Sequence, residues 1–452
     1  MKRLRILVVG GLAAGPSAAA KAVRTNPNAE VTIFEQTDTI SYGLCESPYA
    51  ISGEIANETK LVLYMPERLK AEKGVEVKIF HRAEKILPVK HTVLVRNLHT
   101  REIDEQHYDK LILATGASPR NLHVDGEDGR NVFHVCSRQD TVNILNYLRS
   151  EHPKNAVIIG GGYIGMEMSE ALKRNGLEVT ILHRHKLPMA GLEEETREKV
   201  AEELSHSGVR FVTNARVESL LLDSSGEVNH VLTTKGTFDT DLVILSLGVT
   251  PNVGLAKDAH VRLGSTGAIA TDQRQQTNID GIYAAGDCCE VKNVVNGKPM
   301  YLPLATVASR QGWVAGENAA GGRAAFSGAI RAVAVRVFGL EVAQVGLSSE
   351  EARASGFEVS TQSISAWGKI ALMPDSQKVM IKLILDKRSG KVLGANVYGG
   401  GGAVLRANTL GIAIQHKMTV DDISRFDLIY APPFAPLWDP ILIAANEARK
   451  KL

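Results

Sequence analysis

Cysteine is scarce in this sequence: its 452 residues include four, Cys45, Cys136, Cys288 and Cys289. Four thiols spread over so long a chain cannot build the disulfide framework that holds small secreted domains together, and they fit a reducing compartment. We therefore expect a cytoplasmic protein. Cys288 and Cys289 directly follow Asp287 and are expected to be packing residues.

The sequence also lacks an excess of one charge and long apolar runs. Its 52 Lys and Arg residues nearly balance 50 Asp and Glu residues, for a formal net charge of +2, which predicts neither a nucleic-acid nor a membrane partner. No later run reaches the roughly 18 apolar residues of a spanning helix. The N-terminus has the basic start and apolar run of a secretory signal, but Gly10, Gly11 and Gly15 favour a strand, a turn and a helix.

The chain is rich in glycine, with 41 residues in all. They cluster where the backbone must come close to another group. The first cluster follows the β-branched run Leu4–Val9 and precedes a helical stretch. Val31–Phe34 then predicts a second strand with an acid at its end. This layout binds the pyrophosphate and ribose of a dinucleotide, although Leu12 replaces the middle glycine. Contacts are predicted at Gly10, Gly11, Ala14, Gly15, Glu35 and Gln36.

A second glycine cluster is complete. It follows a strand predicted at Ala156–Ile159 and has glycine at all three positions of the dinucleotide-binding turn. At 452 residues the chain is too long for one hydrophobic core, so two or three domains are expected. Contacts to this second dinucleotide are predicted at Gly160, Gly162, Tyr163, Ile164, Gly165 and Glu167.

The next strand, Val179–Leu182, ends in a basic cluster instead of an acid. A carboxylate there would bond the ribose hydroxyls of NADH and repel a 2′-phosphate, whereas an arginine can accommodate that phosphate. We therefore expect NADPH to be preferred over NADH, with contacts from His183, Arg184 and Lys186. The alternative is a solvated basic turn, which is the usual meaning of a charge run.

Two turns have the character of crossings between domains. One follows a buried strand predicted at Leu111–Leu113, and the other follows a strand predicted at Asp241–Ser246 and spans Gly248–Asn252. Both lie beside predicted nucleotide sites in the chain order. Cofactor contacts are predicted in these turns at Ala114, Thr115, Gly116 and Gly248.

A further strand, within residues 279–284, is expected to deliver Asp287 to the N-terminus of a helix. Its carboxylate would there take a ribityl hydroxyl while backbone N–H groups face phosphate; the alternative is an ordinary helix cap. Gly286 and Ala305 are predicted contacts beside it. Because two nicotinamides would have nothing to exchange, two dinucleotide sites indicate one flavin and one nicotinamide nucleotide.

The character of the chain changes near residue 325. A helix is predicted at Ala403–Gln415, and the segment 426–440 is rich in proline and aromatic residues, as suits an extended segment packed on a partner surface. Strands of an antiparallel sheet are predicted at Val333–Phe338, Val359–Ile364, Val379–Asp386 and Lys391–Tyr398.

The chemistry is predicted at Cys45, within the segment Asp38–Gly53. Pro48 suits the first turn of a helix, so Cys45 is expected at a helix N-terminus, where the helix dipole favours a thiolate. Glu46 opposes that effect, and the sign of the net pKa shift stays open.

Taken together, these motifs resemble those of the pyridine nucleotide-disulfide oxidoreductase superfamily over nearly the whole chain. Cys45 has no second cysteine nearby, and Ser41, Tyr42, Pro48 and Tyr49 fit the Ser-Phe-x-x-Cys-x-x-Pro-Tyr segment of the single-cysteine group, with Tyr42 in place of phenylalanine. That group includes coenzyme A disulfide reductases, NADH oxidases, NADH peroxidases and NAD(P)H-dependent persulfide or polysulfide reductases.

The resemblance implies an α/β fold with two Rossmann-like dinucleotide-binding domains, for FAD and NAD(P)H, and a C-terminal α+β dimerisation domain. The implied FAD-binding domain spans 1–118 and 249–324, the NAD(P)H-binding domain 119–248 and the dimerisation domain 325–452. A homodimer is expected.

The resemblance also implies roles for single residues. Cys45 would be the redox-active cysteine, and Tyr430 would reach it from the neighbouring subunit. Arg24 falls where coenzyme A disulfide reductases place a basic residue for the nucleotide, so coenzyme A is an implied substrate or ligand, with Tyr49 as a second substrate contact. The cofactor contacts implied in the cysteine segment are Ser41 and Tyr42.

The predicted activity is an FAD-dependent NAD(P)H oxidoreductase in which Cys45 attacks a disulfide, a coenzyme A disulfide, a persulfide or a polysulfide. Leu44, Glu46 and Ser47 depart from the group pattern and leave the substrate open. No metal site is predicted, because no His and Cys residues have metal-ligand spacing.

Three alternatives remain. The first is an NAD(P)H oxidase that reduces oxygen through a Cys45 sulfenic acid, although the histidine that oxidases and peroxidases of the group use is absent from Leu12–Ala14. The second is an electron-transfer reductase for a protein partner, with Cys45 merely structural. The third is a redox-sensing or binding protein that uses FAD for structure.

Overall fold

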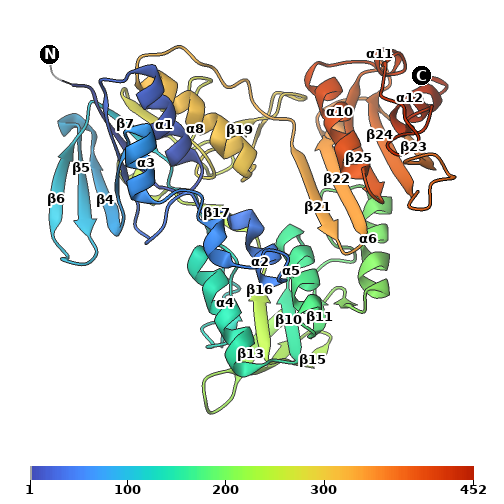
Figure 1. Cartoon of the computed structure of the whole chain (residues 1–452), viewed down its shortest axis with the longest axis horizontal. Coiled ribbons are helices and arrows are strands. Elements are labelled where there is room, and N and C mark those ends of the chain that lie inside the picture. The colour runs from blue at the N-terminus through green and yellow to red at the C-terminus, as the bar shows by residue number, and fades with distance from the viewer. Residues whose placement is uncertain (1–2) are drawn as a thin grey trace.

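The computed structural model describes residues 3–452, which form three structural units (Figure 1). Blue and gold segments, far apart in the sequence, make the first unit; green segments make most of the second; orange and red segments make the third. Within residues 3–452, no helix combines the length and apolarity needed to cross a membrane. Met1 and Lys2, which begin the predicted first domain and the candidate signal segment, lie outside the described residues.

The first unit is built on a five-stranded parallel sheet in the order β18-β7-β1-β2-β3. Its core has two halves, because neighbouring residues of a strand point to opposite faces: Ile6 and Val8 of β1 pack on one face, and Leu7 and Val9 pack on the other. Cys288 and Cys289 lie in the second half, which confirms their packing role. The strands are β1 (Arg5–Val9), β2 (Glu30–Phe34), β3 (Glu76–Lys78), β7 (Lys110–Leu113) and β18 (Ile282–Ala284).

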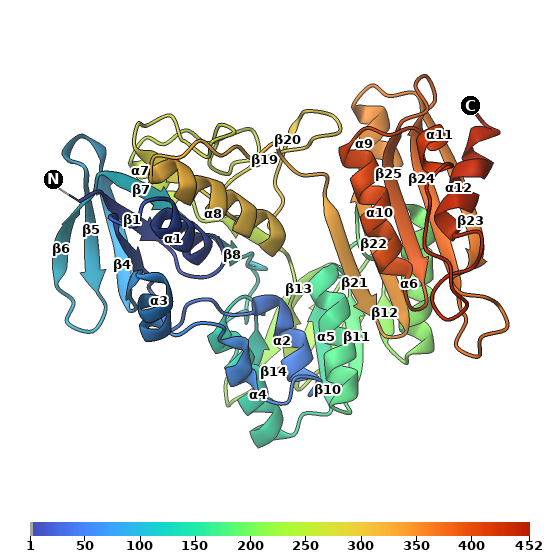
Figure 2. The ribbon, with the colours of Figure 1, turned by 45° about the horizontal axis from the view of Figure 1, so that its top comes forward.

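Helices α1 (Ala14–Thr25) and α8 (Ala305–Ala319) pack against each other beside this sheet (Figure 2). Glycine permits their close approach, because a Cβ atom on Gly316 would lie 2.0 Å from the carbonyl oxygen of Ala18. The helical stretch predicted after the first glycine turn is therefore confirmed, and it pairs with a helix almost 300 residues away in sequence.

The second unit repeats the same plan with a parallel sheet in the order β12-β11-β10-β16-β9. Helices α4 (Arg138–Glu151) and α5 (Tyr163–Arg174) pack on it, and α6 (Glu194–His206) lies toward the third unit (Figure 2). The strands are β9 (Val132–Phe133), β10 (Asn155–Ile159), β11 (Glu178–Leu182), β12 (Arg210–Val212) and β16 (Leu242–Leu245).

The third unit is an antiparallel sheet in the order β21-β22-β25-β24-β23, with helices packed on it. The four strands predicted here are confirmed, and β22 was not predicted. The strands are β21 (Ala332–Val337), β22 (Leu340–Gly346), β23 (Val359–Trp367), β24 (Lys378–Asp386) and β25 (Val392–Gly399). The helices are α9 (Ser349–Ala354), α10 (Ala403–Gln415), α11 (Val420–Ile423) and α12 (Pro440–Arg449).

Smaller elements decorate the first two units. The first carries a β4-β5-β6 sheet and the second a β13-β14-β15 sheet, both antiparallel. The strands are β4 (His81–Leu87), β5 (Thr92–Asn97), β6 (Ile103–His107), β8 (Ala117–Pro119), β13 (Val217–Leu222), β14 (Val228–Thr233), β15 (Gly236–Asp239), β17 (Val249–Pro251), β19 (Val291–Lys292) and β20 (Pro299–Met300). The helices are α3 (Pro66–Lys73) and α7 (Gly254–Asp258).

One predicted element is wrong: no helix begins at Asp287. The chain turns there and continues into the β19-β20 hairpin, and α8 starts later, at Ala305. Instead of forming helical hydrogen bonds, the backbone after Asp287 pairs with Ile269. The N–H of Ile269 donates to the carbonyl of Cys288, and the N–H of Glu290 donates to the carbonyl of Ile269. This extended pairing holds the segment out of a helix.

The contact between α1 and α8 can be tested with two helical glycines. Gly316→Ala should destabilise the protein by about 1–3 kcal/mol, because its Cβ would overlap the Ala18 carbonyl. Gly411→Ala in α10 is the matched control, since its Cβ would meet the flexible end of Ile330 at 3.3 Å. The control should gain up to about 1 kcal/mol of helix propensity. Denaturant midpoints measure both, and equal effects would contradict the contact argument.

Candidate active site

The first glycine turn lies at the carboxyl end of β1 and is held by Glu35, the residue after β2. The Glu35 Oε2 atom accepts the N–H of Gly11 at 2.7 Å, and Oε1 accepts the N–H of Thr37 at 2.8 Å. Gly10 has a φ of +109°, and a Cβ on it would lie 2.1 Å from the carbonyl oxygen of Ala114. The turn is therefore tight in the way that a backbone cradle for pyrophosphate requires.

The second glycine turn has the same construction with one substitution. His183, the residue after β11, accepts the N–H of Gly161 on Nδ1 at 3.1 Å. The bond requires an unprotonated Nδ1, and burial, followed by the neighbouring His185, lowers the pKa of His183 to about 4. A neutral imidazole thus accepts the same glycine-turn N–H that a carboxylate accepts in the first turn. Arg184 and Lys186 are exposed beside it.

The two predicted crossing turns lie side by side. Strands β8 and β17 pair in antiparallel fashion, with Thr250 opposite Ser118. The Thr115 hydroxyl donates to the carbonyl of Asn252 at 2.7 Å, and the Asn252 amide donates back to the carbonyl of Thr115 at 2.9 Å. Ala114, Thr115 and Gly116 are thereby fixed beside the first glycine turn.

Asp287 follows β18 at the same end of the first sheet. The N–H of Gly286 donates to Gln311 Oε1 at 2.9 Å, which sets the turn that carries Asp287. Burial raises the pKa of the Asp287 carboxyl to about 6, and no group within residues 3–452 hydrogen-bonds it. An orphaned carboxyl beside a glycine turn fits a cofactor that brings its own hydroxyl groups, as the ribityl chain of FAD does.

Cys45 lies in a 3₁₀ turn, Leu44–Glu46, directly before helix α2 (Ser47–Ile51). It is the exposed cysteine of the four. Partial burial of the sulfur, then Glu46, Glu167 and Asp287, raise the pKa of Cys45. The sign of the net pKa shift, which the sequence left open, is therefore upward. Carboxylates from the cysteine loop, from α5 and from the turn after β18 therefore all act on one sulfur.

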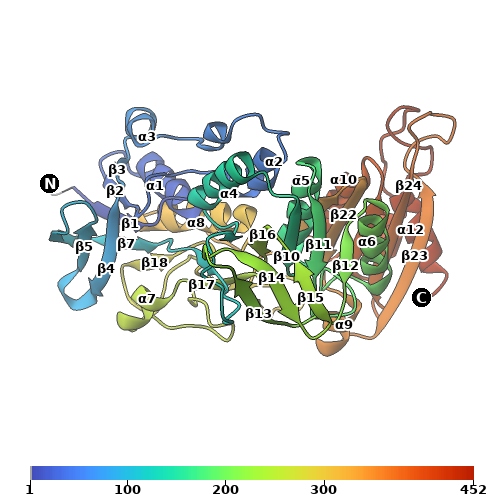
Figure 3. The same cartoon turned by 90° about the horizontal axis from the view of Figure 1, so that it is seen from below.

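Helix α2 is attached to the second unit, although its sequence neighbours belong to the first. Thr141 of α4 donates to the Ser47 hydroxyl at 2.9 Å, and the Asn175 side chain donates to the carbonyl of Ile51 at 2.7 Å. Ile51 itself is part of the apolar core of the second unit. Figures 1 and 3 show α2 lying beside α4 and α5.

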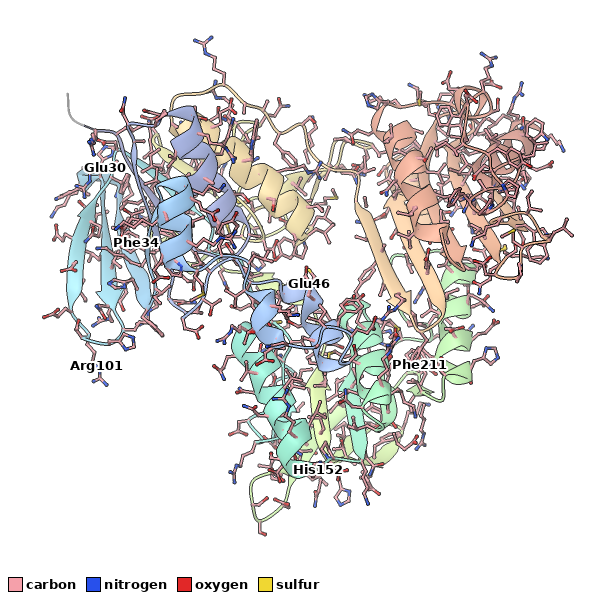
Figure 4. The ribbon with its side chains drawn as sticks, in the orientation of Figure 1. Glu30, Phe34, Glu46, Arg101, His152 and Phe211 are labelled. Atoms are coloured by element: carbon pink, nitrogen blue, oxygen red, sulfur yellow. The ribbon has the colours of Figure 1, made fainter. Side chains whose placement is uncertain are left out.

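The location of this helix puts the cysteine at the boundary between two units. Figure 4 shows Glu46 on the side of the second unit that faces the first, whereas His152, after α4, lies at the opposite end. Cys45 thus sits where the two glycine-turn units meet.

Two predicted residues are not brought to Cys45 within one chain. Arg24 is exposed in the last turn of α1, and Tyr430 is 48% exposed in the third unit. No hydrogen bond or ion pair of the described residues joins either one to the cysteine segment. The segment around Tyr430 also exposes large apolar side chains, as expected of a surface that another subunit covers; they are Ile429, Phe434, Leu437 and Trp438.

Sequence reasoning missed one group of residues at this junction. Arg336 of β21 pairs with Glu54, which follows α2, and with Glu170 of α5. Only the fold brings together three residues so far apart in sequence. No local pattern marked them, since each reads as an ordinary surface charge.

Comparison with known proteins agrees with this architecture. Residues 4–312 match the family described as pyridine nucleotide-disulphide oxidoreductase, and residues 333–440 match its dimerisation domain. The NAD(P)H sulfur oxidoreductase (CoA-dependent) of Pyrococcus furiosus is 34% identical over 448 residues, which are 99% of either chain.

Solved structures are equally similar. The NAD-dependent persulfide reductase of A. fulgidus superposes with a TM-score of 0.96 at 33% identity, covering 99% of this chain and 83% of that one. An engineered water-forming NADPH oxidase, made from a Lactobacillus brevis enzyme, superposes with a TM-score of 0.94 at 27% identity, covering 99% of each. The protein belongs to the pyridine nucleotide-disulphide oxidoreductase family and is a flavoprotein oxidoreductase with a C-terminal dimerisation domain.

Proposed function

We propose that this protein is an FAD-dependent NAD(P)H oxidoreductase that reduces a sulfur–sulfur bond through Cys45. One observation carries the proposal: the exposed thiol of Cys45 directly precedes α2, and Thr141 and Asn175 of the second unit bond that helix, which puts the thiol at the boundary of the two glycine-turn units. A sulfur at that boundary can exchange electrons with groups held by either unit. The Pyrococcus furiosus sulfur oxidoreductase and the A. fulgidus persulfide reductase support this class of substrate.

The residues of the first unit fit FAD, and those of the second fit NAD(P)H. Gly10, Gly11 and Gly15 would cradle the flavin pyrophosphate, and Asp287 would accept its ribityl hydroxyl groups. Gly160, Gly162 and Gly165 would do the same for the nicotinamide nucleotide. When bound, the flavin supplies the two-electron link between the nicotinamide and sulfur.

The chain's own part in the reaction is nucleophilic. The Cys45 thiolate attacks one sulfur of the substrate, an S–S bond forms to Cys45, and the substrate S–S bond breaks. The departing thiolate takes up a proton. We propose that Tyr430 of the partner subunit donates this proton in the homodimer, and that Arg24 and Tyr49 contact a substrate such as a coenzyme A disulfide or persulfide.

We further propose that NADPH is preferred over NADH. His183 holds the Gly161 N–H without a negative charge, and Arg184 and Lys186 are exposed beside it. The engineered NADPH oxidase was made with an Asp→Ala change followed at the next position by Ala→Arg. In that mutant the substituted glycine and the substituted aspartate are 18 positions apart. Gly165 and His183 of this chain have the same spacing.

Cys45→Ser should abolish the reduction of disulfides and persulfides, by on the order of 1,000-fold or more, because a serine hydroxyl cannot form the mixed disulfide with the substrate. NADPH oxidation is followed anaerobically with coenzyme A disulfide, a persulfide or a polysulfide as acceptor. Cys136→Ser is the control and should keep full activity. Full activity of Cys45→Ser would point to a reductase for a protein partner, and turnover with oxygen alone would point to an oxidase.

His183→Glu should shift the preference toward NADH. Glutamate can still accept the Gly161 N–H, as Glu35 does for Gly11, but its charge repels a 2′-phosphate. The ratio of kcat/KM for NADPH over NADH should fall about 10–100-fold. Arg184→Ala should raise the KM for NADPH alone, and Lys173→Ala, a change of a partly buried lysine paired with Glu178 at the far end of α5, should alter neither. An unchanged ratio in His183→Glu would contradict the assignment.

Asp287→Ala should weaken retention of FAD by about 10–100-fold, because a hydrogen bond to a charged group is lost. Flavin absorbance per polypeptide after extensive dialysis measures retention. Asp280→Ala, an exposed change in the loop before β18, is the control and should retain flavin fully. Equal flavin content in both variants would remove Asp287 from the site.

A further inference from the structure

Three buried hydroxyl groups meet beside the cysteine turn, and they come from two separate parts of the chain. The hydroxyl oxygens of Tyr42 and Ser47 lie 3.4 Å apart, and the Thr141 hydroxyl of α4 donates to Ser47 Oγ at 2.9 Å. Tyr42 is 6% exposed, and Ser47 and Thr141 are 0% exposed. Since bulk water does not reach these groups, their hydrogen bonding depends on one another.

The contact between Tyr42 and Ser47 closes a ring over the cysteine turn. Tyr42 lies three residues before Cys45, and Ser47 lies two residues after it. Inside the ring the N–H of Leu44 donates to the carbonyl of Tyr42 at 3.0 Å, and the N–H of Ser47 donates to the carbonyl of Leu44. The backbone of Cys45 is therefore confined between two side chains that contact each other.

The two ends of this ring are attached to different units. Before Cys45, the N–H of Ser41 donates to the carbonyl of Gly11, in the first glycine turn, at 2.9 Å. After Cys45, Ser47 is bonded to Thr141 of α4, in the second unit. The hydroxyl contact across the turn connects these two attachments, with the cysteine between them.

Two of the three residues depart from the segment of the single-cysteine group. Tyr42 stands in place of phenylalanine, and Ser47 departs from the pattern at the second position after the cysteine. A phenylalanine has no hydroxyl group and could not contact Ser47 in this way. The Tyr42 ring itself packs with Ala50 and Leu61, as a phenylalanine ring could. The added hydroxyl group therefore supplies the contact across the cysteine turn and nothing that the packing requires.

We propose that Tyr42, Ser47 and Thr141 are positioning residues for Cys45: their hydroxyl bridge holds the sulfur at the boundary between the first and second units. None of the three hydroxyl groups takes part in the bond changes at sulfur. The bridge reduces the range of conformations open to the cysteine turn, so a larger fraction of the protein has the sulfur placed for attack. The inference rests on the proposed function, in which Cys45 is the reacting thiol.

Tyr42→Phe removes one hydroxyl group of the bridge and keeps the packed ring. With NADPH and coenzyme A disulfide, kcat should fall about 3–10-fold while KM stays within about twofold, because the turn loses a constraint and the substrate contacts remain. Thr141→Val should have the same effect from α4, a helix to which no cofactor contact is assigned. Thr141→Ser keeps the hydroxyl group and should retain kcat. The flavin content of each variant should equal that of the parent protein.

Ser47→Ala is the more severe change, because it leaves the Tyr42 hydroxyl group buried without a partner. Its kcat should fall about 10–50-fold. Adding Tyr42→Phe should recover part of that loss, since the orphaned group is then removed, whereas independent residues would show multiplied losses. Hydrogen exchange of the amides of residues 42–47, followed by mass spectrometry, should become about 3–10-fold faster in Tyr42→Phe and Thr141→Val.

Tyr108→Phe is the matched control. Tyr108 is 4% exposed, and its hydroxyl group has no hydrogen-bond partner among residues 3–452, so its loss should change neither kcat nor the exchange of residues 42–47. Parent values of both measurements in Tyr42→Phe and Thr141→Val would overturn the inference, as would an equal fall of kcat in Tyr108→Phe. A change in only one of the two measurements would also overturn it. Failure of the proposed function reads out separately, as full activity of Cys45→Ser.

Discussion

Helix α2 is held by side chains of a unit to which its sequence neighbours do not belong, and the arrangement around Cys45 depends on that attachment. Thr141, Glu167 and Asn175 each bond one residue of the helix, from its first turn to its last. Five residues make too short a helix to be stable alone. The position of Cys45 is therefore a property of the contact between units, and any shift of the second unit carries the cysteine with it.

The two glycine-turn units show how one backbone plan supports two chemistries. In each, the residue after the second strand accepts the N–H of the second glycine-turn residue, from Glu35 in one case and His183 in the other. The hydrogen bond is needed to hold the turn, so the position requires an acceptor. The charge of that acceptor is free to vary, and the proposed preference for NADPH follows from the neutral imidazole of His183.

The sequence predicted the parallel sheets well because the glycine spacings and the β-branched runs are local signals. The helix from Ala403 to Gln415 was also predicted, directly after the four glycines at 399–402. The missing helix at Asp287 and the junction of Arg336, Tyr49 and Glu167 were not predictable in this way. The first depends on pairing with Ile269, and the second on contact of the third unit with α2 and the second unit.

The charges around the sulfur affect how readily the Cys45 thiolate forms. Three carboxylates act on Cys45, and each makes the thiolate harder to form, yet a nucleophilic thiol must form one. The cost falls if the carboxylates are neutral or hydrogen-bonded at that moment. Glu167 can become neutral by taking a proton, and Asp287 can be satisfied by the hydroxyl groups of a bound cofactor.

Glu46 differs in position, because it lies exposed next to Cys45 in the 3₁₀ turn. It is nevertheless the first of the three charges that raise the pKa of Cys45, followed by Glu167 and Asp287. Under the proposed function, hydroxyl groups of the cofactor would hydrogen-bond Asp287 and offset part of its effect, which links the ionisation of Cys45 to the occupancy of the first unit.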